Sequence, residues 1–346
     1  MKIVHVITGF KLGGAESLLV DIINEQIKTN EVTLIIINND YSQELINSID
    51  NRANIILLNR KCGSHSIIPF IKLNWHIWKI GPYCVHVHKY NTIPLIFPKF
   101  GRKLFLTNHA LNNSVRFVSR ADCIFAISDA VKEDMLKRGK FNVRTIPNGI
   151  ALHNIVKRSK HEIVPKERMR IIEVARINYN IKGQDILINA IAILKKRGYS
   201  NIEVDFFGTG VHEEELKQLA KERGVAEQIH FRGLKDREYI YKHLKDYDLM
   251  CHPARHEGFG LAVAEGIAAM LPTLVPNEGG PYEIIKHGEL GYTFEMENIV
   301  DCANKIEYIY NNYSETFAYT EKAFEYVNNR FSIEKIVKDY LDAYKS

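Results

Sequence analysis

Apolar positions along the chain form short runs of β-branched and aliphatic residues, and these runs alternate with longer segments of helical, amphipathic spacing. In the first half of the chain, segments 15–28 and 128–138 have the spacing of helices that bury one face. The runs that predict buried strands lie at 2–8, 32–37, 55–58, 84–88, 103–107 and 122–127. Strands that alternate with helices predict a parallel sheet covered by helices on both faces.

The same pattern starts again after the turn sequence Pro147-Asn148-Gly149-Ile150. Segment 151–168 is charged and lacks periodicity, which is typical of a linker. Strand patterns follow at 169–175, 202–207, 228–232, 248–252 and 273–276, helical patterns at 183–197 and 212–223, and a final amphipathic pattern at 331–346. The sequence therefore predicts an α/β protein with two doubly wound, Rossmann-like domains in tandem. Ligands of such sheets bind beyond the carboxyl ends of the strands, so we expect the main site in a central cleft between facing domains.

Composition places the chain among soluble globular proteins, with 346 residues of which 46% are hydrophobic and 25% charged. No stretch of about 18 consecutive apolar residues occurs, so no transmembrane helix is expected. The first residues have the pattern of a buried strand, not that of a signal peptide. The five cysteines are scattered and odd in number, which indicates reduced thiols in a cytoplasmic protein.

Charge is divided unevenly between the two halves. Residues 1–150 contain 19 Lys and Arg against 11 Asp and Glu, a net charge of +8, whereas the remainder contains 27 against 30. This asymmetry predicts an anionic partner for the first half, either a phosphate-bearing acceptor or an anionic membrane surface. A solvated basic face without a partner is the open alternative. Nucleic acid is not expected, because no basic run with interleaved aromatic residues is present.

The run from Glu257 to Glu265 is the strongest chemical signal in the sequence. Gly258 and Gly260 permit a tight turn that approaches a ligand closely, and a helix is predicted from Leu261 onward. The start of a helix offers unpaired N–H groups that suit a phosphate. Two acids on either side of an anion site match a nucleotide-sugar, which has a sugar, a diphosphate and a ribose in that order. The alternative is a surface loop followed by a helix with an exposed glutamate.

Two further places in the sequence suit a phosphate. Arg176 closes a predicted strand and Lys182 begins the next helix, so the two cations can bind a diphosphate and stabilise the charge that develops when it leaves. Gly13 and Gly14 open the first helix and permit close backbone approach to a phosphate or sugar. The alternatives are a pair of surface cations and a tight turn without a ligand.

These motifs carry a family resemblance. The sequences His256-Glu-Gly-Phe-Gly260, Ala264-Glu-Gly266 and Glu278-Gly-Gly-Pro281 resemble the C-terminal signature of the retaining glycosyltransferases of family 4, which have the GT-B fold. The Gly-Gly-Ala-Glu at 13–16 and the Arg-x5-Lys-Gly at 176–183 are similar to other motifs of that family. The resemblance implies that the last helix returns to the first domain. It assigns 1–150 with 333–346 to the acceptor side and 151–332 to the nucleotide-sugar donor.

The resemblance also implies roles for individual residues. Glu257 would bind a hydroxyl of the donor sugar, Glu265 the ribose, and Arg176 with Lys182 the diphosphate, while His109 would face the donor sugar near the reacting carbon. These expectations name His109, Arg176, Lys182 and Glu257 as catalytic. The expected donor-binding residues are Gly13, Gly14, Gly208, Gly258, Phe259, Gly260, Leu261, Glu265, Gly279 and Gly280.

The predicted function is transfer of a hexosyl or N-acetylhexosaminyl group from a nucleoside-diphosphate sugar, UDP being favoured, to a hydroxyl of a cell-surface polysaccharide or lipid-linked glycan. No cofactor and no metal are expected, and the location implied is the cytoplasm or the cytoplasmic face of the inner membrane. Three alternatives stay open: a GT-B epimerase, a noncatalytic nucleotide-sugar-binding partner, and an NAD-dependent enzyme in which Asp40 would bind ribose. Two pairs with metal-site spacing, Asp246-x-Asp248 and His86-x-His88, are interpreted as structural, the second because no third ligand is evident.

Overall fold

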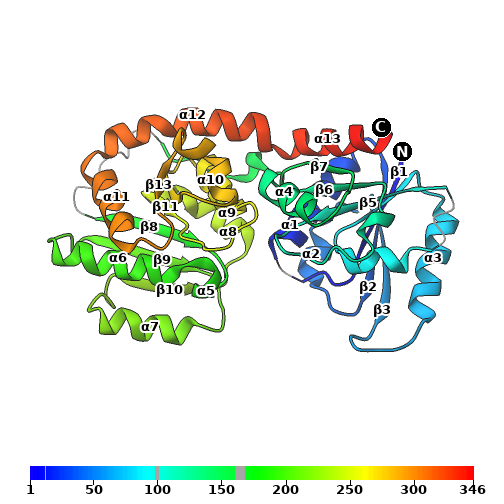
Figure 1. Cartoon of the computed structure of the whole chain (residues 1–346), viewed down its shortest axis with the longest axis horizontal. Coiled ribbons are helices and arrows are strands. Elements are labelled where there is room, and N and C mark those ends of the chain that lie inside the picture. The colour runs from blue at the N-terminus through cyan, green and yellow to red at the C-terminus, as the bar shows by residue number, and fades with distance from the viewer. Residues whose placement is uncertain (12, 98–100, 160–167) are drawn as a thin grey trace. The chain divides into compact units, whose positions relative to one another are not determined.

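The computed structural model describes residues 1–11, 13–97, 101–159 and 168–346. Of the linker predicted at 151–168, residues 160–167 lie outside the described part. The chain forms two compact units: unit 1 comprises Met1–Ile150 and Phe331–Ser346, and unit 2 comprises Ala151–Arg330 (Figure 1). Within the described residues, no helix is long and apolar enough to cross a membrane.

Unit 1 contains a seven-stranded sheet in the order β3-β2-β1-β4-β5-β6-β7, with every neighbouring pair parallel. Its strands are β1 (Lys2–Ile7), β2 (Glu31–Asn38), β3 (Asn54–Arg60), β4 (Cys84–Val87), β5 (Lys103–Asn108), β6 (Cys123–Ala126) and β7 (Val143–Thr145). Its helices are α1 (Gly14–Gln26), α2 (Gln43–Asn47), α3 (Ile68–Ile80), α4 (Asp129–Arg138) and α13 (Ile333–Lys345).

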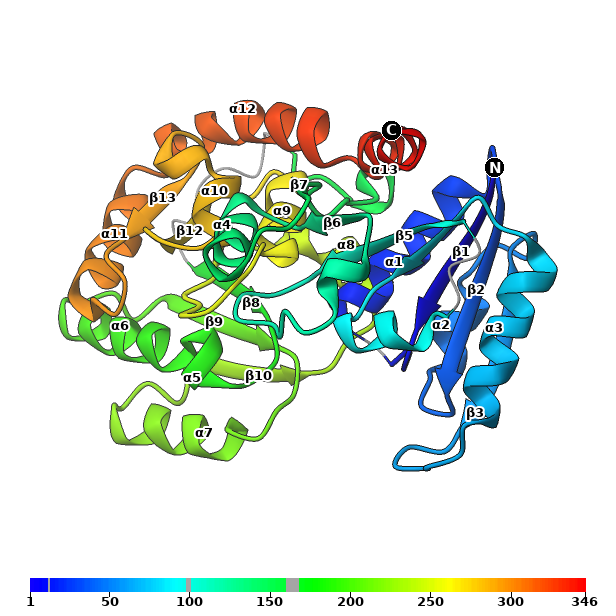
Figure 2. The ribbon, with the colours of Figure 1, turned by 45° about the vertical axis from the view of Figure 1, so that its right-hand side comes forward.

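Both faces of this sheet are buried. Alternate residues of each strand point to opposite faces, so each strand packs apolar side chains on both. Val4 and Val6 of β1 lie in an apolar cluster with Leu73 and Ile77 of α3. Ile7 lies on the other face, in a cluster that includes Leu19 and Ile23 of α1. Figure 2 shows α1 and α3 on opposite sides of the strands. Helix α13 brings Tyr340 and Tyr344, both fully buried, to the α1 side.

Unit 2 contains a six-stranded parallel sheet in the order β10-β9-β8-β11-β12-β13. Its strands are β8 (Met169–Val174), β9 (Ile202–Phe207), β10 (Ile229–Gly233), β11 (Leu249–Cys251), β12 (Thr273–Pro276) and β13 (Tyr292–Phe294). Its helices are α5 (Tyr179–Lys182), α6 (Gln184–Lys196), α7 (Glu213–Glu222), α8 (Arg237–His243), α9 (Leu261–Ala268), α10 (Gly280–Ile284), α11 (Ile299–Asn311) and α12 (Tyr313–Phe331). Helices α6, α7 and α11 cover one face, and α9 covers the other.

The predicted parallel, doubly wound sheet in each half of the chain is confirmed. Several elements were not predicted. Strands β7 and β13 have three residues each, which is too short for a period to be visible. Helix α3 was not predicted because its apolar residues occur on both its inner and its outer face, so the sequence shows no clear amphipathic spacing.

Candidate functional site

Unit 2 brings together a predicted cation and a predicted acid that are 75 residues apart in the sequence. Lys182 is the last residue of α5, and Glu257 lies in the loop between β11 and α9. The distance from Lys182 Nζ to Glu257 Oε2 is 2.5 Å. His252, which follows β11 and is 1% exposed, lies with its Nε2 3.4 Å from the same carboxylate oxygen. The three side chains form a mixed cluster at the carboxyl ends of β8 and β11.

The charge state of Glu257 follows from its neighbours. Burial raises the pKa of its carboxyl, but the hydrogen bond from His252 and the nearby Lys182 ammonium outweigh burial, so the net pKa lies below the usual range. Burial lowers the pKa of His252 and keeps its ring neutral. An ionised carboxylate only accepts hydrogen bonds, so Nε2 of His252 must carry the proton. His252 was not among the predicted site residues; the fold brings it to Glu257.

Arg176 lies in the turn after β8, and its side chain is exposed. Its guanidinium has no side-chain partner among the described residues, so it is available to an anionic ligand. Its main-chain oxygen accepts a hydrogen bond from Gln184 Nε2 at 3.2 Å, and the same nitrogen lies 3.1 Å from Glu173 Oε1. Burial raises the pKa of Glu173 well above the usual range and so favours its neutral form. Gln184 thereby fixes the turn that carries Arg176.

Arg255 positions Lys182 and was not predicted. Its guanidinium donates two hydrogen bonds to Asp185, at 2.7 and 2.9 Å, and one to the Tyr179 oxygen at 2.5 Å. Its backbone N–H donates to the Ile181 oxygen. These bonds hold α5, and with it Lys182, against the loop that leads to Glu257. Only the fold reveals this role, because Asp185 and Tyr179 lie 70 and 76 residues away from Arg255 in the sequence.

The predicted glycines close the loop around Glu257 by tight backbone packing. Gly280 donates its N–H to the Glu257 oxygen at 3.0 Å, and a Cβ there would lie 2.5 Å from the Phe259 nitrogen. Gly183 has φ +70°, and a Cβ there would lie 2.0 Å from the Pro253 oxygen. Alanine is excluded sterically at both positions. Phe259 itself is 3% exposed, so its side chain packs in the interior of unit 2.

The other expected donor-binding residues lie around the same edge of the unit 2 sheet. Glu265 is on α9, which begins at Leu261 after Gly258 and Gly260, and its Oε1 accepts a hydrogen bond from the Tyr241 hydroxyl at 2.8 Å. Gly279 precedes α10. A Cβ at Gly208 would lie 2.0 Å from the Ala175 oxygen, so this glycine lets the turn after β9 pack on the turn that carries Arg176.

Unit 1 has its own cavity, of about 240 Å³, at the carboxyl ends of β1, β4 and β5. Its lining includes Glu16 of α1, Lys89 after β4, and His109 after β5. Lys89 Nζ lies 3.5 Å from Glu16 Oε1. Gly13 precedes α1 and Gly14 is its first residue. The predicted glycine pair therefore lies just before Glu16, which lines this cavity.

Three polar atoms of the cavity lining are buried without a hydrogen-bond partner among the described residues: Nδ1 of His88, Nδ2 of Asn108 and Nε2 of His109. A buried polar group left unpaired costs about 1–3 kcal/mol, so ligand hydroxyls at these atoms would be favoured. Burial and the Lys89 charge lower the pKa of His109 to about 4. Its ring is therefore neutral near pH 7 and suits hydrogen bonding to a sugar hydroxyl.

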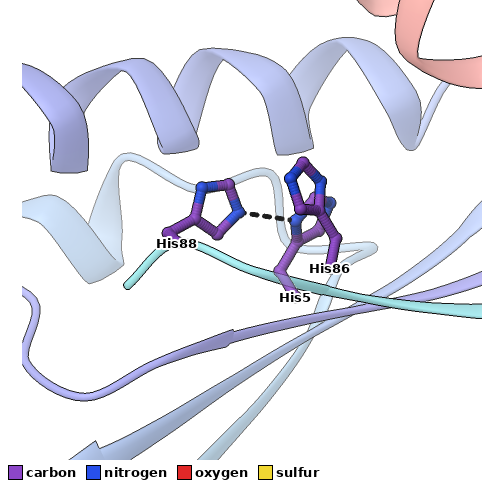
Figure 3. Close-up of side chains that lie close together, drawn as sticks. All are labelled: His5, His86 and His88. Carbon is purple, nitrogen blue, oxygen red and sulfur yellow. Dashed lines mark hydrogen bonds between the residues drawn. The ribbon is translucent and has the colours of Figure 1, made fainter. Parts of the chain in front are cut away.

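His88 of the cavity lining also belongs to a cluster of three buried histidines, His5, His86 and His88 (Figure 3). His5 Nδ1 is 3.0 Å from His88 Nε2, and His5 Nε2 is 2.8 Å from Gln26 Oε1. No third ligand was evident beside His86 and His88 in the sequence, and that statement was wrong, because β1 pairs with β4 in a register that sets His5 beside His86.

This histidine cluster is a hydrogen-bond network that joins the sheet to the C-terminal helix. His86 Nδ1 is 2.6 Å from the Tyr344 hydroxyl, and its Nε2 is 2.7 Å from the Thr107 hydroxyl. Both ring nitrogens of His5 and of His86 thus have a hydrogen-bond partner. Asp248, of the Asp246-x-Asp248 pair, is also occupied: it accepts hydrogen bonds from Arg158 at 2.6 Å and from the Arg170 N–H at 2.7 Å.

Comparisons with known proteins give consistent matches along the chain. The family model of glycosyl transferases group 1 matches residues 156–326, and that of glycosyltransferase family 4 matches residues 12–154. The poly(ribitol-phosphate) α-N-acetylglucosaminyltransferase of Staphylococcus aureus is 24% identical over 225 residues, which are 64% of this chain and 44% of that protein. The chain thus spans less than half the length of that relative.

Two other similar proteins match over more of their length. An N-acetylgalactosaminyltransferase of Campylobacter jejuni, named for an N-acetylgalactosamine-N,N'-diacetylbacillosaminyl-diphospho-undecaprenol acceptor, is 24% identical over 83% of this chain and 84% of its own. The crystal structure of HepE from Anabaena, in complex with UDP and glucose, superposes with a TM-score of 0.85 at 19% identity and covers all of both chains. The structural likeness shows the GT-B fold.

Proposed function

The chain belongs to the group 1 glycosyltransferases of family 4, and on this ground we propose that it transfers a sugar from a nucleoside-diphosphate donor to an acceptor hydroxyl. The observation that carries the proposal is the Lys182–Glu257 pair, with the exposed Arg176 on the adjoining turn. A lysine ammonium has three donors and only one is needed by Glu257, so two are left for diphosphate oxygens. Arg176 adds a second cation for the same leaving group.

A UDP-sugar is the donor that we propose first, carrying a hexosyl or N-acetylhexosaminyl group. HepE, which shares the fold, was crystallised with UDP and glucose. In this proposal Glu257 binds a hydroxyl of the donor sugar and Glu265 binds the ribose. Lys182 and His252 both contact Glu257 Oε2, which leaves Oε1 to accept a hydrogen bond from the sugar hydroxyl. The anomeric configuration would be retained without a covalent intermediate, with Glu257 as a binding residue and not a nucleophile.

The acceptor that we propose is a polysaccharide or lipid-linked glycan bound in unit 1. The unpaired donors and acceptors at His88, Asn108 and His109 suit the hydroxyls of a sugar ring. The relatives in Staphylococcus and Campylobacter are named for a poly(ribitol-phosphate) and for an undecaprenol-linked glycan, both phosphate-bearing. The net charge of +8 over residues 1–150 favours such an acceptor and a place of action at the cytoplasmic face of the inner membrane.

The proposal is tested with purified protein and a panel of UDP-, GDP-, ADP- and dTDP-sugars, by measuring slow release of free nucleoside diphosphate. Release from a single donor is the expected result and identifies the base and sugar together. Conversion of the donor into another nucleotide-sugar without acceptor would indicate an epimerase. Binding of a donor by calorimetry without turnover, even with lipid-linked acceptors, would indicate a noncatalytic partner. Tight binding of NADH in place of any nucleotide-sugar would contradict the proposal altogether.

Replacement of Glu265 by alanine is expected to raise the KM for the donor by about tenfold and to change kcat less, since ribose binding is the same in the ground and transition states. Tyr241→Phe removes the hydroxyl that holds this carboxylate and should give a smaller change in the same direction. The measurement is steady-state kinetics against donor concentration. A loss of kcat as large as that of Lys182→Ala would contradict a ribose-binding role.

Chelation of divalent metals is expected to leave nucleoside diphosphate release unchanged, because Lys182 and Arg176 supply the positive charge at the diphosphate. Asp248 is engaged by Arg158 and by the Arg170 N–H, which supports a structural role for the Asp246-x-Asp248 pair. The rate is measured before and after dialysis against EDTA, and again after addition of Mg²⁺ or Mn²⁺. A loss on chelation that Mn²⁺ restores would mean that a metal assists the leaving group.

A further inference from the structure

Helix α3 (Ile68–Ile80) of unit 1 presents apolar side chains on two faces. Leu73 and Ile77 are buried against the sheet. Ile68, Ile71, Trp75 and Trp78 recur at intervals of three and four residues, which places them on a single stripe on the face opposite the buried one. No described part of unit 1 covers this second stripe, because all four side chains remain exposed.

The exposed stripe continues beyond the helix. Asn74 of α3 donates a hydrogen bond to the Leu95 oxygen and accepts one from the Phe97 N–H, both at 2.8 Å, so Phe97 lies beside α3. The α3 patch is defined here as the six apolar side chains that are between 49% and 70% exposed on this surface: Ile67, Ile68, Ile71, Trp75, Trp78 and Phe97. Large apolar side chains gathered on one face mark an interaction site, whereas scattered ones are ordinary.

The charged residues that surround the α3 patch in the sequence are all basic. Residues 51–121, which include the whole patch, contain eleven Lys and Arg and no Asp or Glu. Lys72 and Lys79 lie on α3 along the edge of the stripe, and Lys79 Nζ is 5.1 Å from the centre of the Trp75 ring. An apolar stripe of isoleucine and tryptophan flanked by lysines is the composition of a helix that lies in a membrane interface.

We propose that the α3 patch docks unit 1 on the surface of an anionic lipid bilayer, with Trp75 and Trp78 at headgroup depth. Tryptophan favours this interface because its ring is apolar and its N–H is polar. The lysines and arginines of 51–121 are attracted to anionic headgroups. A second copy of this chain is a poor occupant, because α3 carries Lys72 and Lys79 without an acid, and two such helices would repel each other. The proposal goes beyond sugar transfer and does not depend on it.

The chain contains two tryptophans, and both lie in the α3 patch, so intrinsic tryptophan fluorescence reports on this surface alone. The protein is titrated with vesicles of phosphatidylcholine and with vesicles of phosphatidylcholine and phosphatidylglycerol. The expected result is a blue shift of the emission with the anionic vesicles, together with quenching when the phosphatidylcholine acyl chains are brominated. Increasing the salt concentration should reduce the fraction bound.

Variants separate the apolar and the charged contributions, with binding measured by cosedimentation. Trp75→Ser/Trp78→Ser should weaken vesicle binding by more than about tenfold, because two aromatic rings would no longer be buried in the bilayer. Lys72→Glu/Lys79→Glu should weaken it by at least about 25-fold, because each lysine near an anionic surface contributes roughly fivefold. The matched controls on unit 2 are Val211→Ser/Leu234→Ser, which removes two exposed apolar side chains, and Lys221→Glu/Lys242→Glu. Both controls should bind as the parent protein does.

Three results would overturn the proposal. Vesicle binding without a blue shift would place the bilayer on another surface. An equal shift with neutral vesicles would remove the role of the charges. A blue shift that depends on protein concentration in the absence of lipid would identify the occupant as another copy of this chain. Because the altered side chains are exposed, thermal unfolding of every variant is expected to match that of the parent protein, and nucleoside diphosphate release is measured separately.

Discussion

Lys182→Ala is expected to lower kcat on the preferred nucleotide-sugar by about 100-fold, with a smaller change in KM. The negative charge on the diphosphate grows as the glycosidic bond breaks, so a cation there stabilises the transition state more than the ground state. A hydrogen bond to a charged group contributes roughly 1.5–3 kcal/mol, which corresponds to a factor of about 10 to 150 in rate. Steady-state kinetics gives the two parameters. Lys196→Ala, an exposed lysine in the last turn of α6, is the matched control and should leave both unchanged.

A double replacement separates two roles that Lys182 can have. If its only role were to neutralise Glu257, adding Glu257→Gln to the Lys182→Ala protein would raise its rate to that of the Glu257→Gln single variant, because the uncompensated carboxylate would be gone. If Lys182 acts on the leaving diphosphate, as proposed, Lys182→Ala/Glu257→Gln will be much slower than Glu257→Gln alone. A double variant as fast as Glu257→Gln would contradict the proposal.

The residues around Lys182 and Glu257 illustrate what could be predicted from the sequence. Glu257 and its glycines were visible because a tight turn before a helix leaves a local signature. Lys182 was visible because it follows a strand by a short, fixed interval. Arg255 was not, because its function depends on bonds to Asp185 and Tyr179 that exist only after β8 and β11 become neighbours.

The histidine cluster shows the same limit more sharply. The spacing His86-x-His88 placed both side chains on one side of β4, but the contribution of His5 depends on the pairing of β1 with β4. That register is set by the whole sheet, since a shift by one residue would turn His5 to the opposite face. The patch on α3 was missed for a different reason: a helix with both faces apolar has no clear period.

Unit 1 is expected to lose stability steeply as the pH falls from 7 to 5. Burial lowers the pKa of His5 to about 4 and the pKa values of His86 and His88 well below 6.5, whereas in the unfolded chain all three titrate near 6.5. Below pH 6.5 the unfolded chain therefore binds protons that the folded chain does not. Each such site lowers the free energy of unfolding by up to about 1.4 kcal/mol per pH unit, so three together give roughly 4 kcal/mol per unit.

Unit 2 should behave differently over the same range. Burial lowers the pKa of His252 and so costs stability on acidification, but burial also raises the pKa of Glu173 well above 4.5. Folded Glu173 holds a proton that the unfolded chain has lost above its ordinary pKa, so this group gains stability as the pH falls. The two contributions oppose each other in unit 2, whereas in unit 1 all three histidines act in the same direction.

Hydrogen exchange measured by mass spectrometry at pH 7 and pH 5, corrected for the intrinsic rates, resolves the two units. Between pH 7 and pH 5, peptides from β1 and β4 should lose much more protection against exchange than peptides from β8 and β9. His109 is a fourth buried histidine of unit 1, with its pKa lowered to about 4. His88→Asn therefore removes one of four titrating rings and should reduce the pH dependence of unit 1 by about a quarter, whatever it does to stability at pH 7, whereas His65→Asn, at an exposed site, should leave it unchanged. Equal loss of protection in both units, or an unaltered slope in His88→Asn, would mean that the buried histidines do not control the response, and that carboxylates elsewhere in the chain do.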